Sequence, residues 1–180
     1  MRLGVIKIIA QINGPSLKEE EMQTLKNKYP EVFSDKLGKL KSQSIKLNID
    51  ETIRPIKQML RRLPEKLKSA VEQELLDMEK LGIIERITWP TDWISNIVAV
   101  PKSQIPLKIR IKCDMRPLNK AIIRTRYATT TVEDVISHAN GAKFFSKIDL
   151  NKAYHQVESD EASRDLKTIT THIGLFRYVR

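Results

Sequence analysis

The sequence predicts an α+β fold, in which helices pack against a sheet whose strands are concentrated in the second half of the chain. One observation behind this prediction is an apolar stripe at helical spacing, formed by Leu67, Val71, Leu75 and Met78. Pro64 suits the first position of such a helix and Gly82 suits the position just after its end. The other observation is a pair of short apolar runs, residues 96–100 and 109–113, joined by a basic connection. Two such runs are typical of the strands of a hairpin.

The remaining elements are expected in chain order. They are a helix opened by a capping box at Ser16–Glu19, a strand over residues 44–49, a short strand over residues 83–86, a helix capped by Thr131 and ended by Asn140–Gly141, a strand over residues 144–150, and two strands within residues 163–180 that turn at Gly174. With 180 residues, the chain is long enough for one ordinary domain or two small lobes with a real core.

The composition favours an anionic partner. Lys and Arg total 32 against 22 Asp and Glu, which gives a net charge of +10, and nucleic acid is the first partner that such a balance suggests. Cys113 is the single cysteine, so no disulfide forms within the chain, as is usual in a reducing compartment. The apolar run near the N-terminus is interrupted by Lys7 and is too short for a membrane span, so a short strand is expected there and no membrane partner.

The predicted hairpin carries most of the candidate binding residues. Lys108, Arg110 and Lys112 alternate along one strand and therefore share one face. Lys102 and Arg116 lie close by in sequence. Clustered cations fit phosphate, whose oxygens a guanidinium grips in a fork, although a solvent-exposed face of a two-stranded ribbon has the same pattern. For Asp114 we expect an ion pair with Arg116 or a nearby lysine rather than an acid catalyst.

A second candidate site centres on Asp149, which stands at the end of the apolar run in FSKIDLNKAYHQV. A carboxylate fixed at a strand end is a suitable ligand for a hard cation such as Mg²⁺. The turn over residues 150–153 would direct backbone N–H groups toward a phosphate, with Tyr154 beside it. The alternative is that Asp149 only caps this turn.

In order and spacing, several segments resemble the reverse transcriptase of gypsy-class long-terminal-repeat retrotransposons. They are YPEVFSDKLGKLKSQSIKLNID, RPIKQMLRRLPEKLKSAVEQELLDMEKLGIIE, WISNIVAVPK, IRIKCDMRPLNKAIIR, GAKFFSKIDLNKAYHQV and SRDLKTITTHIGLFRYVR, which together span residue 29 to the end of the chain. The resemblance implies an N-terminal fragment of a Pol polyprotein with an incomplete right-hand polymerase fold: a fingers hairpin plus a partial palm sheet with packed helices. It divides the chain into an N-terminal connector (1–42), a fingers-like subdomain (43–126) and a partial palm (127–180) that stops before the second catalytic motif.

The resemblance also implies roles for hairpin residues. Arg110 matches the arginine that packs on the incoming nucleotide and its phosphates. Lys102, or alternatively Lys108, would reach the triphosphate, although the segment SQIPL replaces the usual glycine turn at the tip of the hairpin. Arg116 matches a position near the templating base.

In the palm, the resemblance makes Asp149 the first metal-binding and catalytic aspartate, and Leu150 the donor of a backbone N–H to the triphosphate. Tyr154 matches the aromatic gate against a ribose 2′-hydroxyl, and Gln156 would lie nearby.

The implied activity is RNA-directed DNA synthesis with Mg²⁺ as cofactor and with an RNA/DNA template–primer and a deoxynucleoside triphosphate (dNTP) as partners. In the family that the chain resembles, Asp149 acts together with two adjacent aspartates of a Tyr-x-Asp-Asp segment. This sequence contains no adjacent pair of aspartates, so we expect the chain to be inactive alone. Two alternatives stay open: a non-catalytic or domesticated nucleic-acid-binding remnant, and a degenerate copy without a role. An intracellular location, cytoplasm or nucleus, is expected.

Overall fold

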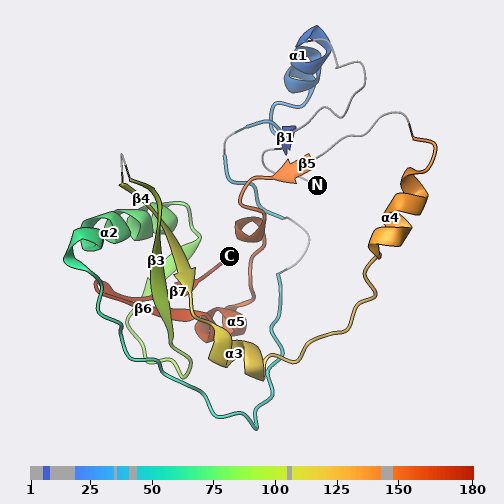
Figure 1. Cartoon of the computed structure of the whole chain (residues 1–180). Helices are drawn as coiled ribbons and strands as arrows, with labels where there is room; N and C mark the ends of the chain where they lie inside the picture. The colour runs from blue at the N-terminus through green and yellow to red at the C-terminus, as the bar shows by residue number, and fades with distance from the viewer. Residues whose placement is uncertain (1–5, 9–18, 35, 41–43, 105–106, 143–147) are drawn as a thin grey trace. The chain divides into compact units, whose positions relative to one another are not determined.

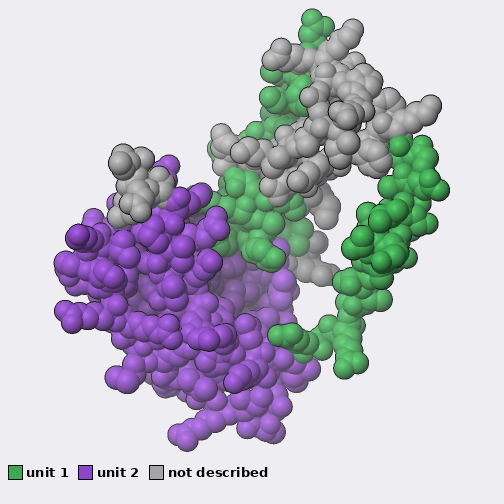
Figure 2. All heavy atoms as spheres, in the orientation of Figure 1, with its two compact units in different colours: residues 1–41, 124–156 green, residues 42–123, 157–180 purple. Residues whose placement is uncertain are grey.

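The computed structural model describes residues 6–8, 19–34, 36–40, 44–104, 107–142 and 148–180. The chain forms two compact units, residues 1–41 with 124–156 and residues 42–123 with 157–180 (Figure 2). Helices and a mixed sheet are both present, so the α+β prediction is confirmed.

A five-stranded sheet forms the centre of the second unit (Figure 1). The order of its strands is β2-β7-β6-β3-β4. Its strands are β2 (Ile84–Ile87), β3 (Ser95–Gln104), β4 (Leu107–Cys113), β6 (Thr168–Thr171) and β7 (Gly174–Tyr178). Neighbouring strands run antiparallel, except that β6 lies parallel to β3 with Ser95 opposite Ile169. The sheet therefore joins strands from two stretches of sequence that lie far apart.

Helix α2 (Glu65–Lys80) packs against β2 and β4 and confirms the helix predicted from the apolar stripe. Val71, Leu75 and Met78 on this stripe are buried. Pro64 stands one position earlier than expected, at the N-cap. Gly82 has a φ of +63°, a backbone conformation that glycine adopts without steric cost, and it follows the end of the helix as predicted.

The hairpin of β3 and β4 is also confirmed. Val98 lies opposite Lys112, Val100 opposite Arg110 and Pro101 opposite Ile109. The register then shifts, so that Ser103 lies opposite Lys108. Lys102 is the extra residue at this irregularity, a β-bulge that increases the twist of the hairpin toward its tip.

The strand expected over residues 44–49 is not present as a strand. The segment instead makes isolated bridges, from Ile45 to Ser159 and from Ile49 to Ile122. Because the two bridges have different partners, the backbone hydrogen bonds do not build a continuous ladder. The alternation of Ile45, Leu47 and Ile49 therefore belongs to an extended segment that forms single bridges and is not a strand of a sheet.

The two strands expected within residues 163–180 do not begin at Ser163, and this part of the prediction is wrong. Residues Glu161–Leu166 form helix α5, and the strands begin at Thr168. The side chain of Asp160 accepts a hydrogen bond from the backbone N–H of Ser163 at 2.9 Å, which caps the helix. The turn between β6 and β7 at Gly174 agrees with the prediction.

The first unit contains α1 (Glu19–Lys28), α4 (Val132–Ala139), the strand pair β1 (Ile6–Ile8) and β5 (Ile148–Leu150), and the 3₁₀ turn η1 (Ala153–Gln156). A reciprocal capping box between Thr131 and Asp134 confirms the predicted start of α4. Ser16 and residues 144–147 of the predicted elements lie outside the described residues. No helix in the described part of the chain has the length and apolar character needed to cross a membrane.

Candidate nucleic-acid interface

The basic residues of β4 lie on one exposed face of the hairpin. Lys108, Arg110 and Lys112 are exposed, whereas Ile109 between them is 5% exposed. This alternation follows from the strand period of two, because α2 covers the other face and takes up the apolar side chains. The predicted shared face is therefore present. Three neighbouring cations repel one another, and an anion placed against them relieves that repulsion.

The residues opposite these cations across the hairpin are Ser103, Val100 and Val98, none of which is acidic. Val98 and Val100 lie opposite Lys112 and Arg110 in register, and Val98 is exposed. Lys102, at the bulge, is exposed as well. We call Lys102, Lys108, Arg110 and Lys112 the hairpin cations. None of the ion pairs found among the described residues involves a hairpin cation, so their charges remain available to an external anion.

Arg116 lies beside the base of the hairpin and is held by Asp114. Its Nε and one terminal nitrogen each donate to a different carboxylate oxygen of Asp114, both at 2.7 Å. Arg61 approaches the same carboxylate at 3.3 Å. The hydrogen bond from Arg116 is the main cause that lowers the pKa of Asp114 to about 2. The expectation of a structural ion pair for Asp114 is confirmed.

The two arginines keep a net positive charge around the nearly buried carboxylate of Asp114. The side chain of Arg116 is 79% exposed and that of Arg61 is 59% exposed. Both guanidinium groups can therefore still be reached from solvent. Sequence reasoning missed Arg61, because it stands 53 residues before Asp114 and no local pattern connects the two.

Arg61 is positioned by the segment before α2, which is attached to the start of β3. The side chain of Asn96 donates to the carbonyl of Met59 at 2.6 Å and accepts from the N–H of Arg61 at 3.2 Å. The side chain of Gln58 accepts from the N–H of Asn96 at 2.9 Å and donates to the carbonyl of Asp114 at 3.1 Å. Asn96 is buried, so its polar atoms require these partners.

In the other unit, the predicted palm residues lie along β5 and η1. The backbone of Asp149 lies opposite Lys7 in the antiparallel register, and Leu150, which is half-buried, lies opposite Ile6. The structure does not describe the side chain of Asp149. Tyr154 is 92% exposed on η1.

Gln156 has a structural environment. It is buried, its side chain donates to the carbonyl of Asn151 at 2.8 Å, and its own carbonyl accepts from the N–H of Leu40 at 2.7 Å. Lys152 has a φ of +49°, a conformation that few non-glycine residues adopt. The side chain of Gln156 thus closes the turn that begins at Asn151.

The described residues contain no cluster of metal-binding side chains. No group of three or more His, Cys, Asp or Glu side chains among them is placed to hold a metal ion.

The chain is similar to Pol polyproteins of retrotransposons. It is 28% identical over 93% of its length to the retrovirus-related Pol polyprotein from transposon 412 of Drosophila melanogaster. It is also 34% identical over its whole length to the uncharacterized protein K02A2.6 of Caenorhabditis elegans. It spans 14% of the length of each of these relatives. No family model matches the sequence.

The fold resembles that of foamy virus protease–reverse transcriptases. The crystal structure of a mutant of the prototype foamy virus enzyme matches 92% of the chain with a TM-score of 0.72 and 19% identity. A foamy viral protease–reverse transcriptase in complex with an RNA/DNA hybrid matches 92% of the chain with a TM-score of 0.69 and 20% identity. In these two solved structures the match covers 22% of the neighbour's chain. The chain is therefore similar in sequence to part of retrotransposon Pol polyproteins and similar in fold to part of foamy virus protease–reverse transcriptases.

Proposed function

We propose that the chain is a fingers and partial palm region of a gypsy-class reverse transcriptase, and that it binds an RNA/DNA template–primer and a dNTP. The observation that carries this proposal is the exposed face of Lys108, Arg110 and Lys112, backed by the buried Ile109. Its relatives are Pol polyproteins, which favours this reading over a domesticated binding protein.

In this proposal the hairpin cations contact phosphates. Arg110 packs on the incoming nucleotide and its phosphates, and Lys102 or Lys108 reaches the triphosphate. Arg116 lies near the templating base, and its bidentate bond to Asp114 holds the guanidinium in one orientation. Asp114 therefore serves as a positioning residue.

For the other unit, we propose that Asp149 supplies one carboxylate ligand for Mg²⁺, and that further ligands come from other residues. Leu150 would donate its backbone N–H to the triphosphate. Tyr154, with its ring almost fully exposed, would act as the gate against a ribose 2′-hydroxyl, and Gln156 would support the turn beside it.

The test measures binding of a fluorescent RNA/DNA hybrid to the full chain by anisotropy over a range of salt concentrations. Each phosphate contact contributes about −0.9 to the slope of log K against log salt for B-form DNA, and a slope of similar size is expected for a hybrid. Replacing Lys108 and Lys112 by Ala should make this negative slope shallower by about 2 and weaken binding regardless of the nucleic-acid sequence.

The matched control replaces Lys66 and Lys80, two exposed lysines on α2, by Ala. Both double variants lose the same charge, so any general loss of electrostatic attraction is shared. The hairpin variant should lose much more affinity than the α2 variant. Equal losses in the two variants would show that only the net charge matters and would reject the hairpin as the binding surface.

A further inference from the structure

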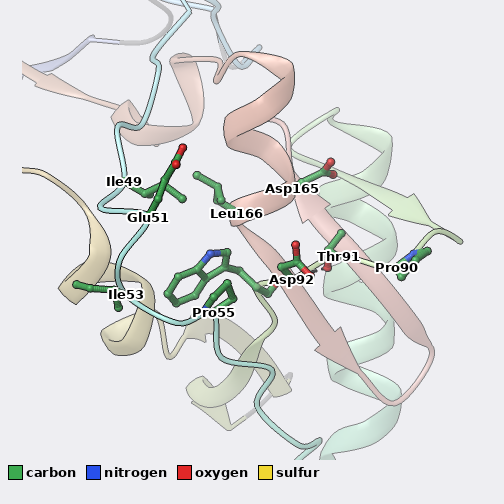
Figure 3. Close-up of a pocket in the computed structure, with 10 residues that line it drawn as sticks. Ile49, Glu51, Ile53, Pro55, Pro90, Thr91, Asp92, Asp165 and Leu166 are labelled. Carbon is green, nitrogen blue, oxygen red and sulfur yellow. Dashed lines mark hydrogen bonds between the residues drawn. The ribbon is translucent and has the colours of Figure 1, made fainter.

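A pocket of about 310 Å³ lies in the second unit (Figure 3). The hairpin cations are not among the residues that line it. Three stretches of sequence line it: residues from 49–55, residues 90–93 before β3, and residues 165–166 at the end of α5. Its volume is at the lower end of the range of small-ligand sites. Nothing in the proposed nucleic-acid interface uses this pocket.

The pocket has preformed walls. The side chain of Asp50 accepts from the N–H of Thr52 at 2.9 Å, and the N–H of Ile53 donates to the carbonyl of Asp50 at 3.1 Å. These bonds fix the turn that carries Glu51. On the opposite wall, the hydroxyl of Thr91 donates to the carbonyl of Trp93 at 3.3 Å. These hydrogen bonds therefore fix the backbone on two sides of the cavity.

The inner surface of the pocket is apolar. Trp93 is 3% exposed and belongs to a buried cluster with Leu118 and Ala121. Ile53 and Leu166 pack against the same cluster and also line the pocket. A ligand that enters would cover the exposed parts of Ile53 and Leu166 and gain the free energy of burying apolar surface.

The polar part of the lining is acidic. Glu51, Asp92 and Asp165 come from the three different stretches, and they are the charged residues among those that line the pocket (Figure 3). The carboxylate of Asp92 lies 3.7 Å from Lys57 in a solvent-exposed pair. No cation is paired with Glu51 in the described part of the chain.

The third carboxylate is only partly neutralised. Asp165 pairs with Arg177 at 2.8 Å, but Arg177 also pairs with Glu85 and Glu161. Arg164 also pairs with Glu85 at 3.8 Å and with Glu161 at 3.0 Å, so two guanidinium groups face three carboxylates. The negative charge of the lining therefore exceeds the positive charge beside it, in a chain whose net charge is +10.

We propose that this pocket binds an organic cation with an apolar stem, an ammonium or guanidinium group carried on an aliphatic or aromatic body. The stem would lie against Trp93, Ile53 and Leu166, and the cation would face Glu51 and Asp92. The acidic lining repels phosphate, so nucleic acid is not the occupant, and the inference is independent of the proposed function.

The test uses the full 180-residue chain with Trp89 replaced by Phe, so that Trp93 is the single emitter. Its fluorescence is followed during titration with phenethylammonium, with neutral 2-phenylethanol and with phenylacetate at constant ionic strength. A second arm titrates the capped dipeptide acetyl-Phe-Arg-amide, whose cation comes from a side chain. Shifts of the Trp93 indole N–H in the ¹H–¹⁵N spectrum of the unmodified chain repeat the measurement without the Trp89 substitution.

We expect at least one of the two cations to bind about tenfold more tightly than 2-phenylethanol, and phenylacetate to bind least. The double variant E51Q/D92N should lose this preference, whereas the control E72Q/E133Q, which removes two exposed carboxylates elsewhere, should keep it. Binding of the peptide alone would assign the source to a protein side chain, and binding of the free amine would assign it to a small molecule. Absence of saturable binding by both cations up to about 10 mM, equal binding of 2-phenylethanol, or an unchanged preference in E51Q/D92N would each overturn the proposal.

Discussion

Replacing Leu75 by Ala tests whether α2 supports the sheet that carries the hairpin. Leu75 has no exposed surface and lies on the buried stripe of α2. The substitution removes three carbon atoms, which at about 0.8 kcal/mol each gives about 2.4 kcal/mol of lost transfer free energy. The cavity left between α2 and the sheet adds about 1 kcal/mol. The free energy of unfolding should therefore fall by about 3 kcal/mol.

The assay is urea unfolding followed by tryptophan fluorescence. Trp89 and Trp93 both belong to the unit that contains α2, so the signal reports that unit. The matched control is Glu72→Ala, an exposed position one turn earlier on the same helix, which should change the unfolding free energy by less than about 0.5 kcal/mol. A loss for Leu75→Ala no larger than that of the control would refute the packing of α2 described here.

Three further predictions concern a thiol, a carboxylate and a helix cap. Burial raises the pKa of Cys113 to about 11 from 9.0, so at pH 8 the native thiol should react with iodoacetamide about 100-fold more slowly than the unfolded thiol; equal rates would contradict its burial. Because the bond from Arg116 lowers the pKa of Asp114 from 3.8 to about 2, its contribution to stability is present above pH 3.8 and is lost as the pH falls toward 2. In acid titrations Asp114→Asn should therefore lose less stability over this interval than the parent chain, and parallel curves would disprove the ion pair. Thr131→Ala should cost α4 about 1 kcal/mol of local stability, seen as faster amide exchange in α4 with unchanged exchange in α2; unchanged exchange in α4 would contradict the capping box.

Local periodicity accounts for the parts that the sequence predicts well. The spacing of Val71, Leu75 and Met78 predicts α2 because these buried residues recur on one face of the helix. The alternation around Ile109 marks the hairpin and its basic face because one side of β4 is covered. The pairing of Asp114 with Arg116 is likewise a contact between residues two positions apart.

Long-range contacts and short elements account for what the sequence did not reveal. Helix α5 has six residues, too few to show a helical period, and its start depends on one side-chain cap at Asp160. The approach of Arg61 to Asp114 and the parallel pairing of β6 with β3 join residues that are far apart in sequence. The pocket beside Trp93 is lined by three stretches of the chain that lie far apart in sequence. No pattern within a short window encodes these contacts.

The most direct test of the central claim locates the nucleic acid on the protein. The full chain is photo-crosslinked to an RNA/DNA hybrid at low salt, and the attached peptides are identified by mass spectrometry. The account predicts that most crosslinks fall within residues 107–116, which contain Lys108, Arg110, Lys112 and Arg116. Crosslinks concentrated on α2 or on α1, with residues 107–116 unmodified, would contradict the assignment of the hairpin as the nucleic-acid-binding surface.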